Sequence, residues 1–168
     1  VRTPNDYFET SVDQEIDFIK EFLNEVKKGQ DFELSRIQEN FSIYFPRLNT
    51  LKHGFIDWSW DTEDIENFIC SFDEPYPGAS TFIDGKKVHL KKCYSEFNDG
   101  PFHPFQIGLI YKIYSGAVFI ATRLGTLIVH EVLDENGKNI IVKLYLGQRF
   151  YTPLKHLEES MTFSAEYT

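Results

Sequence analysis

The sequence contains only two cysteines, Cys70 and Cys93, and neither belongs to a Cys-x-x-Cys pair or has a histidine at metal-ligand spacing. A disulfide framework or a zinc site is therefore excluded as the organising feature, and buried free thiols are expected. The longest charge-free apolar run, residues 113–122, is too short to span a bilayer. The N-terminus lacks the apolar segment of a signal peptide. These absences predict a cytoplasmic chain with no membrane partner.

The common catalytic motifs are also missing. There is no Gly-x-Gly-x-x-Gly, no Gly-Lys-Ser/Thr, no Gly-x-Ser-x-Gly and no His-Glu-x-x-His. A general base needs an oriented partner and a substrate pocket, and the sequence places neither beside any histidine. Carboxylates gather between Asp57 and Glu66, where an expected helix start explains them through its dipole. The residues by themselves do not predict an enzyme or a metal site. The histidines are His53, His89, His103, His130 and His156.

What the chain does contain is enough apolar material for a core. Its 168 residues are 42% hydrophobic and 16% aromatic, and the 16 Phe and 9 Tyr favour strands over a helical bundle. The net charge of −9 is unevenly placed, because residues 1–78 carry 7 Lys/Arg against 17 Asp/Glu, whereas residues 79–168 carry 10 against 9. The acidic first part would repel nucleic-acid phosphates, and the second part is open to anionic partners.

Helical spacing predicts a first helix whose apolar stripe runs from Ile16 to Val26. Ser11 or Asp13 is expected to cap its start, and Lys27-Lys28-Gly29 its end. Because the opposite face is charged, the stripe is expected to pack against a neighbour. Residues 30–50 are then expected to form an extended edge segment or a connector, because Pro46 argues against a strand interior.

A second helix is expected to begin at Asp61 or Thr62 and to bury a stripe from Ile65 to Phe72. Two prolines then stop it, and after Gly78 the apolar period changes from 3.6 to 2. The expected strands are residues 79–83, 86–94, 107–114, 117–122, 126–132 and 139–146.

Tight turns are expected between these strands. Asp84-Gly85 suits a type I′ hairpin, and Ser115-Gly116, Leu124-Gly125 and Asn136-Gly137 mark the others. A last helix is expected with Pro153 at its first position and with Leu154 and Leu157 facing inward. The pattern predicts an α+β fold, mainly β: a small OB-like antiparallel barrel preceded by helices.

One strand carries a basic stripe. Alternation places Lys87, His89 and Lys91 on the face opposite Val88 and Leu90. Barrels of this kind can bind oligonucleotides with such a face, so these three residues are candidates for contact with an anion or an acceptor. The stripe has no interleaved aromatics for base stacking, and a solvated outer face is the commoner setting for lysine.

Three stretches are distinctive: GFIDWSW at residues 54–60, FICSFDEPYPGASTF at residues 68–82 and DGKKVHL at residues 84–90. Together they resemble the C-terminal region of the formyltransferase family, which includes methionyl-tRNA formyltransferase and the amino-sugar formyltransferases. The family pattern is Ile-Asp-Trp-Ser, a short helix ending in Ile-Arg-Ala, then Pro-x-Pro-Gly-Ala and a hairpin. Residues 147–160, GQRFYTPLKHLEES, look like the closing segment of several members. Taken by themselves, the two motifs predict a helix–barrel junction in which Trp58 is a buried anchor, Asp57 bonds local backbone and the prolines set the chain direction. The matching residues are Ile56, Asp57, Trp58, Ser59, Pro75, Pro77, Gly78 and Ala79.

The resemblance also implies a division of the chain. Residues 1–50 would be the end of a catalytic domain and its linker, and residues 51–168 a C-terminal barrel domain with a short terminal helix. The family's catalytic Asn, His-x-Ser-Leu-Leu-Pro stretch and Asp do not occur here, so no catalytic or cofactor-binding residue is assigned and this chain alone is expected to be inactive. The family's Arg-Ala falls on Cys70-Ser71, so no role of that arginine is carried over. The missing initiator Met is consistent with a trimmed chain, a processed chain or a fragment.

Three functions are compatible with these residues. In the first, the chain is the C-terminal part of a 10-formyltetrahydrofolate-dependent formyltransferase that acts on an amino sugar nucleotide, and it frames the acceptor or forms a homodimer. Alternatively, it holds tRNA within a methionyl-tRNA formyltransferase, or it is a stand-alone β-barrel interaction module. Tight tRNA binding calls for a clear positive excess, which the barrel lacks. We therefore expect a small-molecule acceptor, and partners in the parent's catalytic domain and in a second copy.

Overall fold

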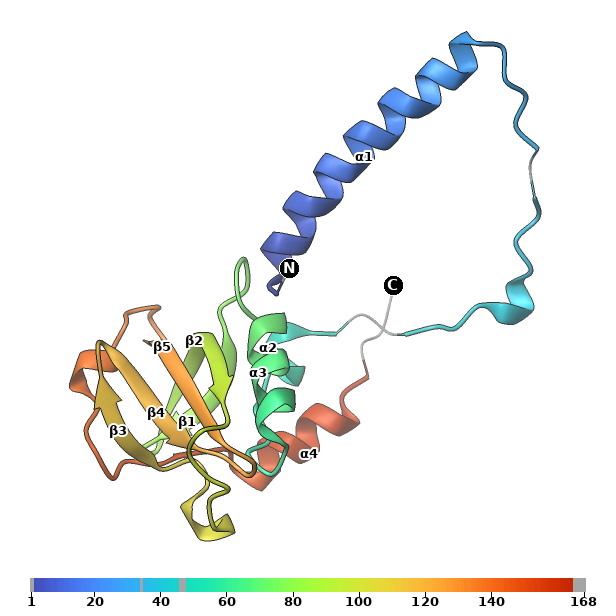
Figure 1. The fold of residues 1–168 in the computed structure, drawn as a ribbon. Helices are drawn as coiled ribbons and strands as arrows, with labels where there is room; N and C mark the ends of the chain where they lie inside the picture. Colours follow the sequence, from blue (N-terminus) through green and yellow to red (C-terminus); the bar gives the residue numbers. More distant parts are fainter. Residues whose placement is uncertain (1, 34, 46–47, 165–168) are drawn as a thin grey trace.

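A six-stranded antiparallel sheet forms the centre of the computed structural model, which describes residues 2–33, 35–45 and 48–164 (Figure 1). Its strand order is β3-β4-β5-β2-β1-β6, and every pairing is antiparallel. The predicted α+β class, mainly β, is therefore confirmed. The strands are β1 (Ala79–Ile83), β2 (Lys86–Glu96), β3 (Ile110–Tyr114), β4 (Ala117–Ala121), β5 (Thr126–Asp134) and β6 (Phe150–Tyr151).

The two edges of the sheet meet, so the sheet is barrel-like. Ile110 N donates to Gln148 O at 2.8 Å, and Phe150 N donates to Gly108 O at 2.8 Å. An isolated bridge between Leu109 and Arg149 lies within this contact. Backbone groups at the start of β3 and β6 are thereby paired rather than left as open edges. The expected small antiparallel barrel is confirmed at this level.

Two hairpin turns have the conformation that their sequences predict. Asp84 and Gly85 have φ of 49° and 76°, and Ser115 and Gly116 have φ of 51° and 76°. Positive φ at both central residues is the requirement of a type I′ turn, whose twist matches that of the flanking strands. The hairpins β1–β2 and β3–β4 therefore follow from short-range sequence.

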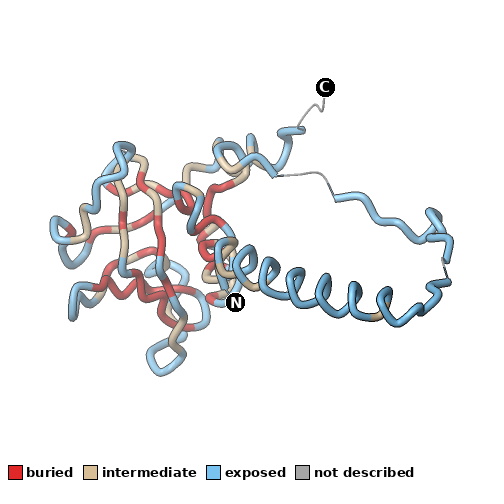
Figure 2. The backbone as a smooth tube through the Cα atoms, turned by 90° about the horizontal axis from the view of Figure 1, so that it is seen from above, coloured by how far each residue is buried: buried red, intermediate tan, exposed pale blue. Residues whose placement is uncertain are grey.

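Helix α3 (Thr62–Ser71) covers one side of the barrel with the stripe that the sequence predicts. Ile65 and Ile69 are fully buried and Phe72 nearly so, in a core shared with β1, β2, β4 and β5. The burial colouring in Figure 2 shows the same concentration in the barrel and α3. The N-cap is Asp61, one of the two residues expected there.

Helix α1 (Pro4–Lys27) is longer than predicted, and the expected caps at Ser11 and Asp13 are wrong. The helix starts earlier because Thr3 and Asp6 form a capping box, with Asp6 N donating to Thr3 Oγ1 at 3.2 Å and Thr3 N donating to Asp6 Oδ2 at 3.0 Å. Its end after Lys27 is as expected.

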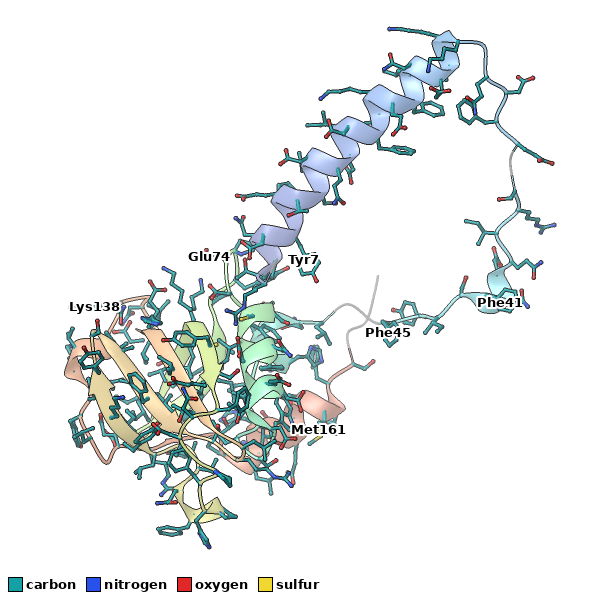
Figure 3. The ribbon with its side chains drawn as sticks, viewed as in Figure 1. Tyr7, Phe41, Phe45, Glu74, Lys138 and Met161 are labelled. Carbon is teal, nitrogen blue, oxygen red and sulfur yellow. The ribbon has the colours of Figure 1, made fainter. Side chains whose placement is uncertain are left out.

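The start of α1 touches the loop after α3, through a hydrogen bond from Asn5 N to Glu74 O at 3.1 Å. Figure 3 shows Tyr7 and Glu74 on the two sides of this contact, and Figure 2 shows the rest of α1 exposed. Most of the apolar stripe stays exposed in the part of the chain that the structure describes, with Phe22 at 42% and Ile19 at 53% exposure. Phe22 contacts the Phe32 ring of the connector, at 4.9 Å between ring centroids. The neighbour that the sequence predicts for this stripe is therefore not the barrel.

The connector is extended as predicted, with one short turn, η1 (Glu39–Phe41), and Pro46 lies outside the described residues. It ends in α2 (Thr50–His53), a helix that the sequence did not predict. Asn49 begins this helix, since its side chain accepts from Leu51 N and Lys52 N at 3.0 and 3.1 Å.

The strand expected over residues 139–146 is wrong. The Asn139 side chain accepts from Ile141 N at 3.0 Å and starts a 3₁₀ turn, η3 (Ile141–Lys143). The backbone therefore uses its hydrogen bonds locally, and pairing with β1 waits until β6. The Asn136-Gly137 turn itself is present, with Gly137 N donating to Asp134 O.

Helix α4 (Leu154–Thr162) begins next to Pro153, which precedes the helix rather than occupying its first position. Leu154 is 66% exposed, so the prediction that it faces inward is wrong. His156 makes the contact instead, stacking on Phe55 at 4.8 Å and Phe82 at 5.0 Å between ring centroids. None of the described helices is long and apolar enough to cross a bilayer.

Candidate functional site

The Ile-Asp-Trp-Ser motif and the closing segment GQRFYTP line one cavity of about 430 Å³ on the barrel. These two stretches are far apart in sequence, and the turn η2 (Pro104–Gln106) closes the cavity at one side. The barrel thus gathers the two segments that carry the family resemblance. The lining residues are Asp57, Trp58, Ser59, Pro104, Ile107, Arg149, Phe150, Tyr151, Thr152 and Leu157.

Trp58 is one of the buried residues that line this cavity. Its Nε1 donates to Thr81 Oγ1 at 2.9 Å, and Thr81 donates on to Tyr151 O at 3.1 Å. The indole also stacks on Phe150 with ring centroids 5.9 Å apart, and only 7% of Trp58 is exposed. Because its polar group is satisfied inside the protein, Trp58 joins the motif to β1 and β6.

Asp57 and Ser59 shape the backbone at the cavity edge. Ser59 N donates to Asp57 Oδ1 at 2.9 Å, and Trp60 N donates to Asp57 O at 3.2 Å. Just before them, Ile56 N donates to Ser80 O at 2.9 Å, which aligns the motif with β1. The Asp57 carboxylate therefore stabilises a local turn, as an Asx residue does.

Arg149 is a residue of this site that the sequence analysis did not assign. Its Nη1 donates to Ile107 O at 2.8 Å, and its guanidinium lies 5.2 Å from the centre of the Phe105 ring. The neighbouring Gln148 is 8% exposed and donates to Asp84 Oδ2 at 2.6 Å. The only sequence signal for either was their place in the closing segment, and their partners come from distant loops.

The Pro-x-Pro-Gly segment crosses the outer face of β2. Gly78 has φ of 108°, and a Cβ there would lie 2.9 Å from both Leu90 O and Lys91 Cγ. Only glycine combines this conformation with so close an approach. Pro75 and Pro77 precede it after the end of α3 and lead the chain from the helix onto β1.

The structure separates the three residues of the basic stripe. Lys91 is 4% exposed, with its Nζ 2.9 Å from Glu74 Oε1 and 3.7 Å from Asp73 Oδ1. His89 shares a hydrogen bond of 3.2 Å with Ser80 Oγ, and burial, followed by the nearby Lys87 charge, lowers the pKa of its imidazole. Lys87 lies 5.1 Å from the Phe55 ring centre. The expected common outward face is therefore wrong for Lys91, because the Pro-x-Pro loop covers it. Contact with an anion stays a prediction for all three.

Other candidates take structural positions. His103 caps η2 by accepting from Phe105 N at 3.2 Å, and Glu66 accepts from Ser95 N at 2.7 Å. Among the described residues, no three His, Cys, Asp or Glu side chains are placed to hold a metal ion. Within the same residues, every buried side-chain nitrogen and oxygen has a hydrogen-bond partner. None of these buried side-chain atoms therefore lacks a partner that a folate or another ligand would supply, and we assign no chemical step to a cofactor.

The comparisons point to one family. The methionyl-tRNA formyltransferase of Desulfotalea psychrophila is 29% identical over 93 residues, which are 55% of this chain and 28% of that protein. That of Geobacter metallireducens is 27% identical over 131 residues, 77% of this chain and 39% of that protein. The bifunctional polymyxin resistance protein ArnA of Wigglesworthia glossinidia brevipalpis is 34% identical over 59 residues, 35% of this chain and 9% of that protein. The chain thus spans well under half of each relative.

A solved structure shares the fold. HypX from Aquifex aeolicus, crystallised in complex with tetrahydrofolic acid, aligns with a TM-score of 0.54 and 22% identity, covering 86% of this chain and 22% of HypX. Residues 50–149, more than half of the chain, match the family described as formyl transferase, C-terminal domain. The barrel, the α3 junction and both cavity-lining motifs lie in or beside this range, and the chain belongs to the formyl transferase C-terminal domain family.

Proposed function

We propose that this chain is the C-terminal domain of a 10-formyltetrahydrofolate-dependent formyltransferase whose acceptor is an amino sugar nucleotide. The observation that carries the choice of acceptor is the burial of Lys91 between Asp73 and Glu74. Lys92 is likewise paired, with Glu131 at 2.8 Å. Because these strand lysines pair with carboxylates of the same chain, fewer cations of the barrel remain to neutralise phosphates. Its function is then to frame the acceptor at the cavity of the Ile-Asp-Trp-Ser motif.

The second candidate is a tRNA-holding domain. It is favoured by the relatives from Desulfotalea psychrophila and Geobacter metallireducens, which are named methionyl-tRNA formyltransferases. The exposed lysines Lys86, Lys138 and Lys143 are available for phosphate contacts. Against it stands the near-neutral charge of the barrel beside an acidic N-terminal part.

The third candidate, a stand-alone interaction module, is disfavoured by the uncovered stripe of α1. Exposed apolar patches of this extent mark a partner surface. We propose that the division near residue 50 is a domain boundary, and that a catalytic domain of the same parent chain covers α1. In this proposal formyl transfer and 10-formyltetrahydrofolate belong to that domain, the protein is cytoplasmic, the barrel is OB-like and the parent is a homodimer. The chain alone has no formyltransferase activity.

The acceptor choice is tested by titrating the chain with tRNA over a series of salt concentrations. We expect no salt-dependent complex near physiological ionic strength. Charge reversal must avoid the buried Lys91, so the test variant is Lys86→Glu with Lys87→Glu. The matched control is Lys20→Glu with Lys155→Glu, two exposed lysines on α1 and α4. Tight binding by the unmodified chain that only the first variant abolishes would establish the tRNA candidate instead.

Self-association is tested separately by light scattering over a range of protein concentrations. The α1 stripe predicts association of the isolated chain, and Phe22→Glu with Ile19→Glu should abolish it. Glu15→Lys, on the polar face, is the control. A strict monomer at high concentration would count against self-association of the isolated chain.

A further inference from the structure

The two cysteines lie against each other between α3 and β2. Cys70 is in the last turn of α3 and is 7% exposed, and Cys93 is in β2 and is 5% exposed. Cys93 Sγ is 3.9 Å from Glu66 O, the carbonyl one helical turn before Cys70. Arg2 Nη2 lies 3.8 Å from Cys70 Sγ and 3.4 Å from Cys93 O. One guanidinium therefore contacts the Cys70 thiol and the Cys93 carbonyl, and it also forms an ion pair with Glu66 Oε1. These contacts place the two cysteines next to each other where α3 packs on β2.

We propose that Cys70 and Cys93 are a reversible dithiol–disulfide modification site, in which Cys70 is the attacking thiolate and Cys93 the resolving thiol. Sequence spacing alone predicts two unrelated buried thiols. Their contact is produced by the packing of α3 on β2. Since the chain has no other cysteine, the pair has no competing partner within the sequence.

The surroundings make the two thiols chemically different. The hydrogen bond from Cys93, followed by the bond and charge of Arg2, lowers the pKa of Cys70 to about 6, against the opposing effect of burial. Interaction with Cys70 and then burial raise the pKa of Cys93. At neutral pH Cys70 is therefore mostly thiolate, whereas Cys93 keeps its proton and donates it to Cys70. A thiolate beside a cation is the form that reacts with oxidants.

The oxidant in this proposal is a peroxide. The Cys70 thiolate attacks one peroxide oxygen, the O–O bond breaks, and the leaving hydroxide takes a proton to become water. Cys70 is then a neutral sulfenic acid, which removes the negative charge that opposed ionisation of Cys93. The Cys93 sulfur attacks Cys70, the S–O bond breaks, and the departing hydroxide carries away the Cys93 proton as water. Two thiols lose two electrons, and one peroxide is reduced to two waters.

The site is tested on the full chain with hydrogen peroxide, followed by alkylation and intact-mass measurement. We expect the product to lose two hydrogen atoms, to resist alkylation, and to accept two alkyl groups after reduction. A non-reducing peptide map should join the α3 peptide to the β2 peptide. Stepwise addition of oxygen atoms without a cross-link, or disulfides between chains only, would overturn the proposal.

A geometric control keeps two cysteines but moves one. In the variant Cys70→Ser with Ser71→Cys the new thiol occupies an exposed position, where Ser71 Oγ now donates to Asn67 O at 2.8 Å. It should form no intrachain disulfide, and cross-linking as fast as in the unmodified chain would refute the importance of the contact.

The roles of the two thiols are tested with single variants. Cys93→Ser should leave a sulfenic acid on Cys70 that a cyclic 1,3-dione traps, and Cys70→Ser should give at least tenfold less trapping on Cys93. Equal trapping would contradict the assigned roles. Arg2→Met should shift the rate–pH profile of Cys70 oxidation to higher pH, and Arg2→Lys should restore part of it. An unchanged profile would remove Arg2 from the site.

Discussion

Replacing Lys91 by methionine tests whether the basic stripe is part of the fold. Methionine keeps an unbranched apolar side chain of similar size and removes the ammonium group, with its charge and its hydrogen bond to Glu74. In the structure that charge faces Asp73 and Glu74, and only 5% of the lysine side chain is exposed. Asp73 is itself 4% exposed, and its other contacts are hydrogen bonds from Glu74 N and Lys92 N at 2.8 Å each. The substitution therefore leaves a buried carboxylate without its counter-charge.

The expected cost follows from this burial. Breaking a buried ion pair by removing one partner costs about 3 kcal/mol, much more than losing an exposed pair. The known losses for such pairs run from about 3 to 5 kcal/mol. We expect the lower figure for Lys91, because Asp73 keeps its backbone hydrogen bonds and Glu74 is exposed to solvent. With a denaturant slope of about 2 kcal/mol per molar urea, the midpoint should fall by about 1.5 M.

The assay is urea unfolding followed by the fluorescence of the only two tryptophans, Trp58 and Trp60. Trp58 is buried in the barrel, so its emission reports on the core to which β2 belongs. Lys87→Met is the matched control on the same strand. It should cost less than about 1 kcal/mol, since Lys87 forms no ion pair with a carboxylate of the described residues and its ammonium lies over the Phe55 ring. If both variants lost the same stability, our account of Lys91 as a buried structural ion would be wrong.

Two further predictions concern the same loop and strand. Gly78→Ala should lower the free energy of unfolding by more than about 2 kcal/mol, because the backbone there is left-handed and the new Cβ would lie 2.9 Å from Leu90 O. Gly85→Ala is the control, since the Cβ there has open space around it, and it should cost about 1 kcal/mol. Equal urea midpoints for the two variants would contradict the close approach at Gly78. For His89, burial and the Lys87 charge lower the folded-state pKa below the ordinary 6.5. The unfolded chain therefore binds the proton first, and stability should be full above this value and decline as pH falls through the folded pKa. His89→Gln should flatten the dependence of the urea midpoint on pH in that window, and a slope as steep as that of the parent chain would assign the effect to other groups.

Much of the fold could be predicted because its signals are local. Apolar spacing identified α3 and its buried face, and the dipeptides Asp84-Gly85 and Ser115-Gly116 identified two hairpins through the positive φ that their turns require. The strand expected over residues 139–146 failed because the side chain of Asn139 competes for backbone donors, which an apolar pattern does not reveal. The start of α1 failed because the expected caps ignored the stronger Thr3–Asp6 capping box.

The candidate site divides in the same way. The sequence by itself determined the family motif, the glycine and proline positions of the junction, and the two free cysteines. Tertiary structure alone decided that Lys91 is covered by the loop carrying Glu74, that Arg149 meets Ile107, and that Cys70 and Cys93 both contact the Arg2 guanidinium. The physical reason is the range of the interactions. Alternation and capping act over a few neighbouring residues, whereas the burial of a charge or the pairing of two thiols depends on which distant segment folds over them.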